Sequence, residues 1–369
     1  MSTFDSAFAP FLVVEDPRAP NRVHPFESIL FVVIVGTLCG ADGFVEIEQF
    51  AKVRRRFIEK YVPLPAGVPT HDTLGRVFQA IDPKQFRKAF ATYIAGLTGT
   101  PVDDVIAIDG KTLRGAIDRK AEQNAKANDQ VHMVSAYSKN RGVVLAQLRS
   151  AAVANENQAA RDLLEVLDVN GAVVTMDAAH CQVATVNLAV ARGAEVVVGL
   201  KKNQKHLFNA AEALCNQGCP DAVVETEEVS RGRHEVRRYE MHSATSTTAD
   251  GPFAALHSFT KVLRTTKLAT GKTTVTTSYY ASSLKPGDRL ASCIRARWCI
   301  ENSLHYCLDV AFDEDGCRVR TANAAENLSR VRHLALSLMK LAGGTSVGLG
   351  ARRFMAMGDD DYLARILSL

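Results

Sequence analysis

The sequence predicts a mixed α/β protein that begins with helices and carries a strand-rich insertion in its α/β core. Three observations lead to this fold class. Residues 1 to about 100 place apolar side chains at helical spacing. From about residue 103, short apolar runs alternate with amphipathic segments, as expected when strands alternate with helices. Between about 219 and 283, Thr, Ser and Val dominate and the residues alternate in polarity, which predicts strands.

Composition excludes several classes of protein. Of the 369 residues, 47% are hydrophobic and 23% are charged, which excludes a disordered chain and fibrous repeats. The 44 basic and 40 acidic residues give a net charge of only +4, so any basic surface has to be local. No apolar run is long enough for a membrane span, and the eight cysteines form no Cys-x-x-Cys pair. We expect a cytoplasmic protein with reduced thiols and no secretory signal, structural zinc or membrane partner.

The helices of the first 100 residues are predicted from their spacing and from their first residues. Segments 26–38 and 45–61 carry apolar residues in a helical pattern. Thr70, and Asp82 followed by proline, are typical of helix N-termini, because short polar side chains accept hydrogen bonds from free backbone N–H groups. A compact bundle of short helices is therefore expected in this part of the chain.

The core is predicted as a succession of strands and helices. Strands are expected at 105–108, 131–137, 143–148, 173–176 and 195–200. Helices are expected at 157–167, 185–191 and 205–215 and, after the insertion, at 286–308 and 324–341. A turn rich in Asn and Gly separates the second and third strands, which indicates a hairpin.

Two aspartates follow apolar strands of this predicted core. Asp109 and Asp177 stand at the carboxyl ends of their strands, where open α/β sheets bind ligands. Small residues follow both, which leaves room for a metal and a phosphate. A single aspartate at such a position more often caps a helix or forms a turn, but two at matching positions favour a catalytic role.

Glu301 is the third candidate acid. It lies inside the predicted 286–308 helix, where Arg297 and His305 share its face because residues four apart are neighbours on a helix. Ile294 and Leu308 are on the same face, so this face is expected to point inward, where a charged residue needs a metal or a partner. The alternative is an ion pair between Arg297 and Glu301 on a solvated face. Three carboxylates would suit Mg²⁺, which prefers oxygen ligands.

Basic side chains near these acids and in the insertion are candidate phosphate ligands. They are Lys111, Arg114, Lys201, Lys202, Lys205, Arg231, Arg233, Arg237, Arg238 and Arg297. A solvated basic loop is an equal alternative for residues 201–205. His180 and His305 are expected to orient water or a phosphate. Neither is an expected ligand of the ion itself, because histidine suits softer metals better than Mg²⁺. Trp298 either stacks on a base or packs in the core.

Each of the three candidate acids lies in a longer motif. The motifs are 108–115 (IDGKTLRG), 176–182 (MDAAHCQ) and 297–315 (RWCIENSLHYCLDVAFDED). They resemble the signature of bacterial insertion-sequence transposases of the ISAs type, also called H-repeat-associated proteins. Segments 16–18, 24–25, 38–42 and 69–78 resemble the domain associated with that family, and the similarity runs from about residue 13 to 341.

The resemblance implies a DDE transposase with an RNase H-like (retroviral-integrase-like) core. In that fold the first Asp is on the first strand, the second on the fourth strand and the Glu on a late helix, which matches Asp109, Asp177 and Glu301. These acids would hold two Mg²⁺ or Mn²⁺ ions, with His180, His305 and Asn302 in supporting roles. A broader related group carries a Tyr and a Lys where this chain has Ile294 and Leu308, so its handling of DNA hairpins is not carried over.

The resemblance also implies the function and the domain plan. The protein is expected to nick double-stranded DNA at terminal inverted repeats and to join the freed ends to target DNA, as a homodimer in a synaptic complex at the bacterial nucleoid. The expected parts are a helical DNA-binding domain (1–100), a first core segment (101–218), the insertion (219–283), a second core segment (284–345) and a tail (346–369). The alternatives are an RNase H-like nuclease without strand transfer, or a domesticated inactive derivative that only binds DNA.

Overall fold

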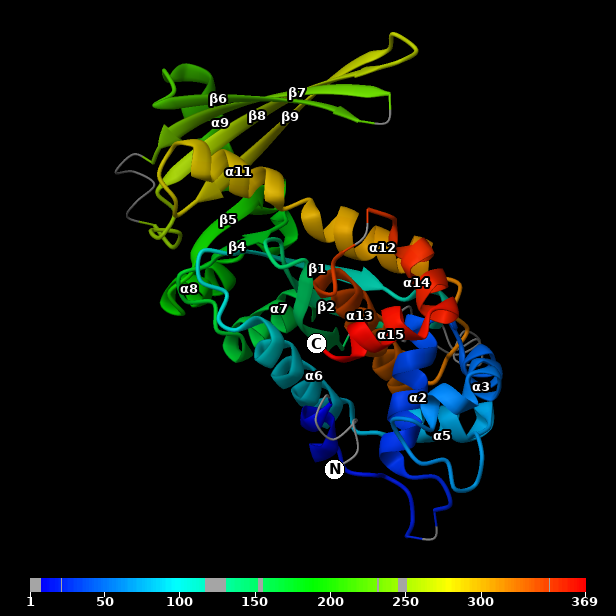
Figure 1. Ribbon diagram of the computed structural model, residues 1–369. Helices are drawn as coiled ribbons and strands as arrows, with labels where there is room; N and C mark the ends of the chain where they lie inside the picture. Colours follow the sequence, from blue (N-terminus) through cyan, green and yellow to red (C-terminus); the bar gives the residue numbers. More distant parts are fainter. Residues whose placement is uncertain are drawn as a thin grey trace, which may run out of the picture. The chain divides into compact units, whose positions relative to one another are not determined.

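The computed structural model describes residues 8–20, 22–116, 131–151, 155–230, 232–244, 251–344 and 346–369. These residues form two compact units (Figure 1). The helical unit comprises Met1–Thr100, Gly110–Ala159 and Ile300–Leu369, and the sheet unit comprises Pro101–Asp109 and Ala160–Cys299. Strand β1 (Val105–Thr112) and helix α7 (Glu156–Val166) run from one unit into the other, so each unit is built from several stretches of sequence.

Helices α2 and α13 form the centre of the helical unit. Its elements are η1 (Ala9–Val13), α2 (Phe26–Leu38), α3 (Phe44–Val53), α4 (Arg55–Ile58), α5 (His71–Ala80), α6 (Pro83–Thr98), α12 (Tyr306–Phe312), α13 (Ala322–Leu341), α14 (Leu349–Gly358) and α15 (Asp360–Leu367). From Ser28 to Leu38 every residue of α2 is buried, which is typical of a helix that is apolar on all sides. Helix α13 packs against α2, α5 and α6.

The predicted helix starts at Thr70 and Asp82 are confirmed. The Thr70 hydroxyl accepts a hydrogen bond from the backbone N–H of Thr73, and the Asp82 carboxylate accepts one from that of Lys84. The single helix expected over 45–61 is wrong, because the chain forms α3 and α4 with a break at Arg54. The Arg54 side chain binds the α14–α15 connection through the Met357 carbonyl and Asp360, a long-range contact that helical spacing does not encode.

The helical unit also contains the predicted hairpin. Strands β2 (His132–Ser138) and β3 (Val143–Ser150) are antiparallel, and the strand order continues from β3 through β2 to β1. Gly142 in the turn has a φ of 71°, a conformation that glycine adopts at little cost. Helix α13 packs on β3, so the hairpin and the helices share one core.

The sheet unit is organised around one mixed sheet. Its strand order is β1-β4-β5-β9-β8-β7-β6, with β4 (Val173–Met176), β5 (Glu195–Leu200), β6 (Ala222–Ser230), β7 (Arg233–Ser243), β8 (Ser258–Leu268) and β9 (Thr273–Ser282). Strands β1, β4 and β5 are parallel, and β9 joins β5 antiparallel. The strand-rich insertion therefore extends the core sheet. Helix α9 (Lys205–Gln217) packs on β7, β8 and β9, and helix α11 (Asp288–Ala296) packs on β4 and β5 (Figure 1). Helix α8 (Val183–Ala191) packs on β5.

The single helix expected over 286–308 is wrong. Helix α11 ends at Ala296, a turn follows, and residues Glu301–His305 form a π-helical turn, η6, ahead of α12. Hydrogen bonds in a π turn reach one residue further than in an α-helix, so residues four apart no longer line up along one face. The face predicted to join Arg297, Glu301 and His305 is therefore not preserved.

Two further expectations concern the thiols and the membrane. All eight cysteines are free thiols. Among the helices of the described ranges, none has both the length and the apolarity that a membrane span requires.

Candidate active site

Asp109 and Asp177 lie next to each other on neighbouring strands of the sheet unit. The parallel register pairs Ile108 with Met176, so Asp109 and Asp177 are the next pair along the ladder. Adjacent strands are roughly 4.8 Å apart, and residues at matching positions project from the same face of a sheet. Both aspartates are half-buried. The structure thus brings two of the three predicted acids together where β4 ends. Asp177 directly follows its strand as predicted, but Asp109 lies within β1, which continues to Thr112, and does not end it.

The Asp177 carboxylate is held by backbone groups. Asp177 is the N-cap of the short 3-10 turn η4 (Ala178–His180), and its Oδ1 accepts hydrogen bonds from the backbone N–H groups of Ala179 at 2.8 Å and His180 at 3.3 Å. Gly199 on β5 allows this turn to approach closely, because a Cβ there would lie 3.2 Å from the Ala178 nitrogen. Among the described residues no lysine or arginine forms an ion pair with Asp177, so nothing described cancels its charge.

The basic loop after β5 is tied to the Asp177 segment. The Asn203 side chain donates a hydrogen bond to the Ala178 carbonyl at 2.7 Å, and the Gln204 side chain donates one to the Cys181 carbonyl at 2.8 Å. Lys201, Lys202 and Lys205 of this loop are exposed, and within the part of the chain that is described none of them has a carboxylate partner. The hydrogen bonds therefore position three unpaired ammonium groups on a loop fixed to the Asp177 turn.

Glu301 begins the π-helical turn of the helical unit. Its side chain is half-buried, and the following Asn302 is exposed. Burial, with a contribution from His333 and Lys111, lowers the pKa of His305 to about 4, so this imidazole is neutral at pH 7. π-Helical turns occur frequently at functional sites. The π-helical turn therefore favours a functional role for Glu301. Residue spacing typical of an α-helix does not predict such a turn.

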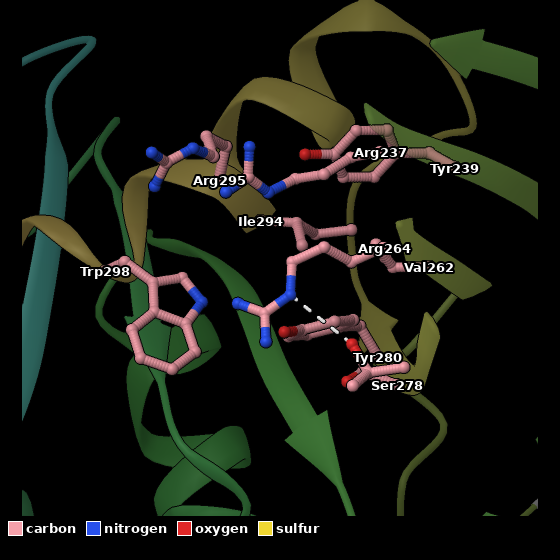
Figure 2. Close-up of a pocket in the computed structure, with 10 residues that line it drawn as sticks. Arg237, Tyr239, Val262, Arg264, Ser278, Tyr280, Ile294, Arg295 and Trp298 are labelled. Carbon is pink, nitrogen blue, oxygen red and sulfur yellow. Dashed lines mark hydrogen bonds between the residues drawn. The ribbon is translucent and has the colours of Figure 1, made fainter. Parts of the chain in front are cut away.

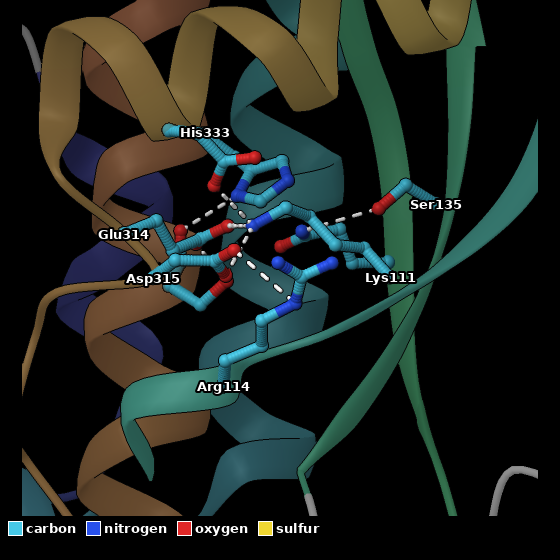
Figure 3. Close-up of polar contacts among 9 residues, drawn as sticks. Lys111, Arg114, Ser135, Glu314, Asp315 and His333 are labelled. Atoms are coloured by element: carbon cyan, nitrogen blue, oxygen red, sulfur yellow. Dashed lines mark hydrogen bonds and ion pairs between the residues drawn. The ribbon is translucent and has the colours of Figure 1, made fainter.

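Lys111 is engaged in a buried ion-pair cluster within the helical unit (Figure 3). Its Nζ lies 2.6 Å from Asp309, 3.1 Å from Glu314 and 3.1 Å from Asp315. Only 12% of the Lys111 side chain is exposed. Arg114, by contrast, is 82% exposed and lies 3.6 Å from Asp315. The predicted role of Lys111 as a phosphate ligand would require it to leave three carboxylates.

The basic residues of the insertion differ in how far they are neutralised. Arg237 is largely buried and forms ion pairs with Glu228 and Glu235. Arg238 pairs with Glu225 and Glu240, whereas Arg233 is exposed. Arg231 lies outside the described residues.

A pocket in the sheet unit gathers cations and aromatic rings. It lies between β7–β9 and α11 and is lined by Arg237, Arg264, Arg295, Tyr239, Tyr280 and Trp298, among others (Figure 2). Trp298 is 36% exposed, so of the two alternatives left open for it, packing in the core is excluded. The Arg297 guanidinium lies 4.5 Å from the centre of the Trp298 ring, within the range of a cation–π contact.

Two functional candidates in the helical unit are not apparent from the sequence. His132 on β2 is buried, and its ring contacts Thr112 on β1 and Glu156 in the first turn of α7, each at 2.9 Å. An acidic residue in the first turn of a helix is favourable to the helix dipole, so Glu156 has an ordinary explanation in the sequence. Only the fold reveals that its carboxylate meets a buried histidine.

Comparisons with known proteins identify the family of this chain. A family model described as "DDE_Tnp_1-associated" matches residues 8–94, and one described as "Transposase DDE domain" matches residues 100–338. "H repeat-associated putative transposase YhhI" of Escherichia coli K12 is 30% identical over 96% of this chain and 96% of its own length. "Putative transposase YncI" of Escherichia coli O157:H7 is 32% identical over 96% and 93%.

A shorter relative carries a different description. "Inactive transposase YbfQ" of Escherichia coli K12 is 36% identical over 60 residues, which cover 16% of this chain and 71% of that protein.

The family model covers well over half of this chain, and the first two relatives cover nearly all of it. The chain therefore belongs to the family of transposases with a DDE domain, enzymes that act on DNA with the help of a divalent metal.

Proposed function

We propose that this transposase cleaves DNA at the terminal inverted repeats of its insertion sequence and joins the freed 3′ ends to target DNA. Asp109, Asp177 and Glu301 are the proposed catalytic carboxylates. The observation that carries the proposal is the parallel register of β1 and β4, which continues directly to the Asp109–Asp177 pair where β4 ends. The half-buried Glu301 on its π-helical turn completes the set.

The proposed core is RNase H-like. It is supported by a first aspartate on the first strand, a second on the fourth strand and a glutamate on a late helical segment, which is the order of elements in that fold. The proposed parts are the helical end-recognition domain (1–100), the core segments (101–218 and 284–345), the insertion (219–283) and the tail (346–369). A homodimer in the synaptic complex completes the proposal.

The donor atoms of the three acids fit two Mg²⁺ or Mn²⁺ ions. All are carboxylate oxygens, which hard divalent cations prefer. Asp177 has one oxygen held by backbone N–H groups, and no lysine or arginine of the described ranges forms an ion pair with it, which suits a cation ligand. When bound, such ions activate water and stabilise the entering and leaving oxygens of a phosphodiester.

The remaining residues bind and orient the DNA in this proposal. Lys201, Lys202 and Lys205 neutralise backbone phosphates, because their ammonium groups are exposed on a loop fixed to the Asp177 turn. The pocket beside Trp298 offers guanidinium groups and aromatic faces, a combination that suits nucleotides. Arg297, Arg114 and Arg233 add phosphate contacts, while His180, His305 and Asn302 support the acids. Lys111 and Arg237 contribute less because each is already ion-paired.

The test is cleavage and joining of DNA that carries the ends of the element. Wild type is compared with Asp109→Asn, Asp177→Asn and Glu301→Gln in Mg²⁺, and Glu165→Gln on the exposed side of α7 is the matched control. We expect each active-site variant to lose at least about a hundredfold in rate, because these carboxylates would hold the ions that stabilise charge in the transition state, and the control to match wild type. Equal nicking by wild type and Asp177→Asn overturns the catalytic assignment. Cleavage without joining of pre-cut ends identifies a nuclease instead.

A further inference from the structure

A buried histidine connects the strand that carries Asp109 to the first turn of α7. His132 is 4% exposed. Its Nδ1 lies 2.9 Å from the Thr112 hydroxyl, and its Nε2 lies 2.9 Å from Oε2 of Glu156. The Glu156 side chain is 21% exposed, and its Oε2 contacts the buried ring.

The chemistry of the groups sets the direction of these hydrogen bonds. An ionised carboxylate can only accept, so Nε2 of His132 donates to Glu156. The other ring nitrogen, Nδ1, contacts the Thr112 hydroxyl, which donates to a neutral ring and accepts from a protonated one. The chain from Thr112 through His132 to Glu156 therefore fixes the orientation of the carboxylate from the protein interior.

Gly110 shows where this carboxylate lies. A Cβ built on Gly110 would be 2.6 Å from Cδ of Glu156 and would also collide with Nε2 of His132. Any side chain at this position would displace the pair, so glycine is required for close approach. Gly110 directly follows Asp109 in β1, and the Glu156 carboxyl group thus packs against the backbone of the residue next to a proposed catalytic acid.

We propose that Glu156 is a fourth carboxylate of the active site and a ligand of the divalent cation. The inference rests on the proposed function, because it assumes that Asp109 holds that cation. Carboxylates that bind metals are usually oriented by hydrogen bonds from surrounding residues, and His132 with Thr112 behind it supplies such an arrangement. A purely structural ion pair between His132 and Glu156 is the competing explanation, and the experiment separates the two.

The experiment measures Mn²⁺ binding to the full chain without DNA, from the loss of the electron paramagnetic resonance signal of free Mn²⁺. Glu156→Gln is the main variant, because it keeps the size of the side chain and an oxygen that can accept from His132. Asp109→Asn tests the proposed site itself. Glu165→Gln is the control on the same helix, since Glu165 is exposed.

We expect Glu156→Gln and Asp109→Asn each to weaken Mn²⁺ affinity by at least about tenfold, the lower end of the losses seen when even the supporting residues of metal sites are changed. Glu165→Gln should bind as wild type does. Thermal unfolding without metal is measured for every variant. Weakened binding by Glu156→Gln with an unchanged melting temperature supports a ligand and not a structural ion pair.

The outcomes distinguish this inference from the proposed function. If Glu156→Gln binds Mn²⁺ like wild type while Asp109→Asn does not, the inference fails and the proposed function stands. If Asp109→Asn binds like wild type, the proposed metal site itself fails, and the inference with it. If Glu156→Gln does not fold, Glu156→Asp replaces it, because it keeps the charge but shortens the side chain. Unchanged affinity in Glu156→Asp then overturns the inference, and an intermediate loss supports it.

Discussion

Asp177 and Glu314 are both carboxylates next to the ends of regular elements, but the protein holds them in different ways. Asp177, in the sheet unit, accepts hydrogen bonds from two backbone N–H groups. Glu314, in the helical unit, is fully buried and is held by the Lys111 ammonium at 3.1 Å and the Ser329 hydroxyl at 2.9 Å. Neutral dipoles leave a carboxylate its charge, whereas an ammonium cancels it. The first arrangement is suited to binding a cation, and the second to holding the fold together.

In the Lys111 cluster (Lys111, Asp309, Glu314 and Asp315), the opposite charges shift one another's pKa toward the ionised forms. Burial alone would lower the pKa of Lys111, but the neighbouring carboxylates outweigh burial and raise it. Burial likewise acts to raise the pKa of Glu314, and Lys111 with its neighbours lowers it. Both groups therefore stay ionised at neutral pH. Because of this attraction, removing either the ammonium or a carboxylate of the cluster is expected to lower the stability of the protein.

The largest effect is expected when the cluster loses its cation. Lys111→Met removes the ammonium from Asp309 and Glu314 and leaves Asp315, among the described residues, only its contact with Arg114, and breaking a buried pair in this way costs about 3–5 kcal/mol of unfolding free energy. Urea unfolding of the full chain measures it. Arg114→Met is the control, because Arg114 is 82% exposed and such pairs are worth at most about 1 kcal/mol. Equal unfolding midpoints for Lys111→Met and wild type would mean that the Lys111 cluster does not stabilise the fold more than the Asp177 turn does.

A smaller effect is expected on acidification. Burial lowers the pKa of His333 from 6.5 to about 4 in the folded protein. Between these values the unfolded chain binds a proton that the folded chain does not, so stability is present above pH 6.5 and is lost as pH falls toward 4. One such group removes about 2 kcal/mol between pH 7 and pH 5. Urea unfolding at both pH values should show a smaller loss in His333→Gln, and an identical loss would contradict this assignment.

The smallest change in stability is expected at Asp177. In Asp177→Asn the amide oxygen can still accept from the backbone N–H groups of Ala179 and His180, and no described ion pair is broken. Unfolding free energy should change by less than about 1 kcal/mol, as for substitutions that leave buried hydrogen bonds satisfied. Urea unfolding checks this beside Lys111→Met. A loss of several kcal/mol would mean that Asp177 holds the fold together as Glu314 does.

Local patterns of sequence determined most of the secondary structure. The caps at Thr70 and Asp82, the hairpin with Gly142 and the apolar runs of β1 and β4 depend on neighbouring residues only, so spacing and end residues predict them. The position of Asp177 directly after β4 followed for the same reason, whereas the prediction that the first strand ends before Asp109 was wrong, because β1 continues to Thr112. At Arg54, where the chain breaks between α3 and α4 and the side chain contacts distant residues, the prediction of one continuous helix was wrong.

The sequence by itself thus determined the order of strands and helices, the family motifs and the two aspartates that lie in β1 and directly after β4. Only the tertiary structure decided that these strands are neighbours in register, that the Glu301 helix is interrupted by a π-helical turn, and that Lys111 is neutralised. It also decided that His132 meets Glu156 beside Gly110. The physical reason is that hydrogen-bond partners and counterions far apart in sequence are chosen by packing, and packing depends on the whole fold.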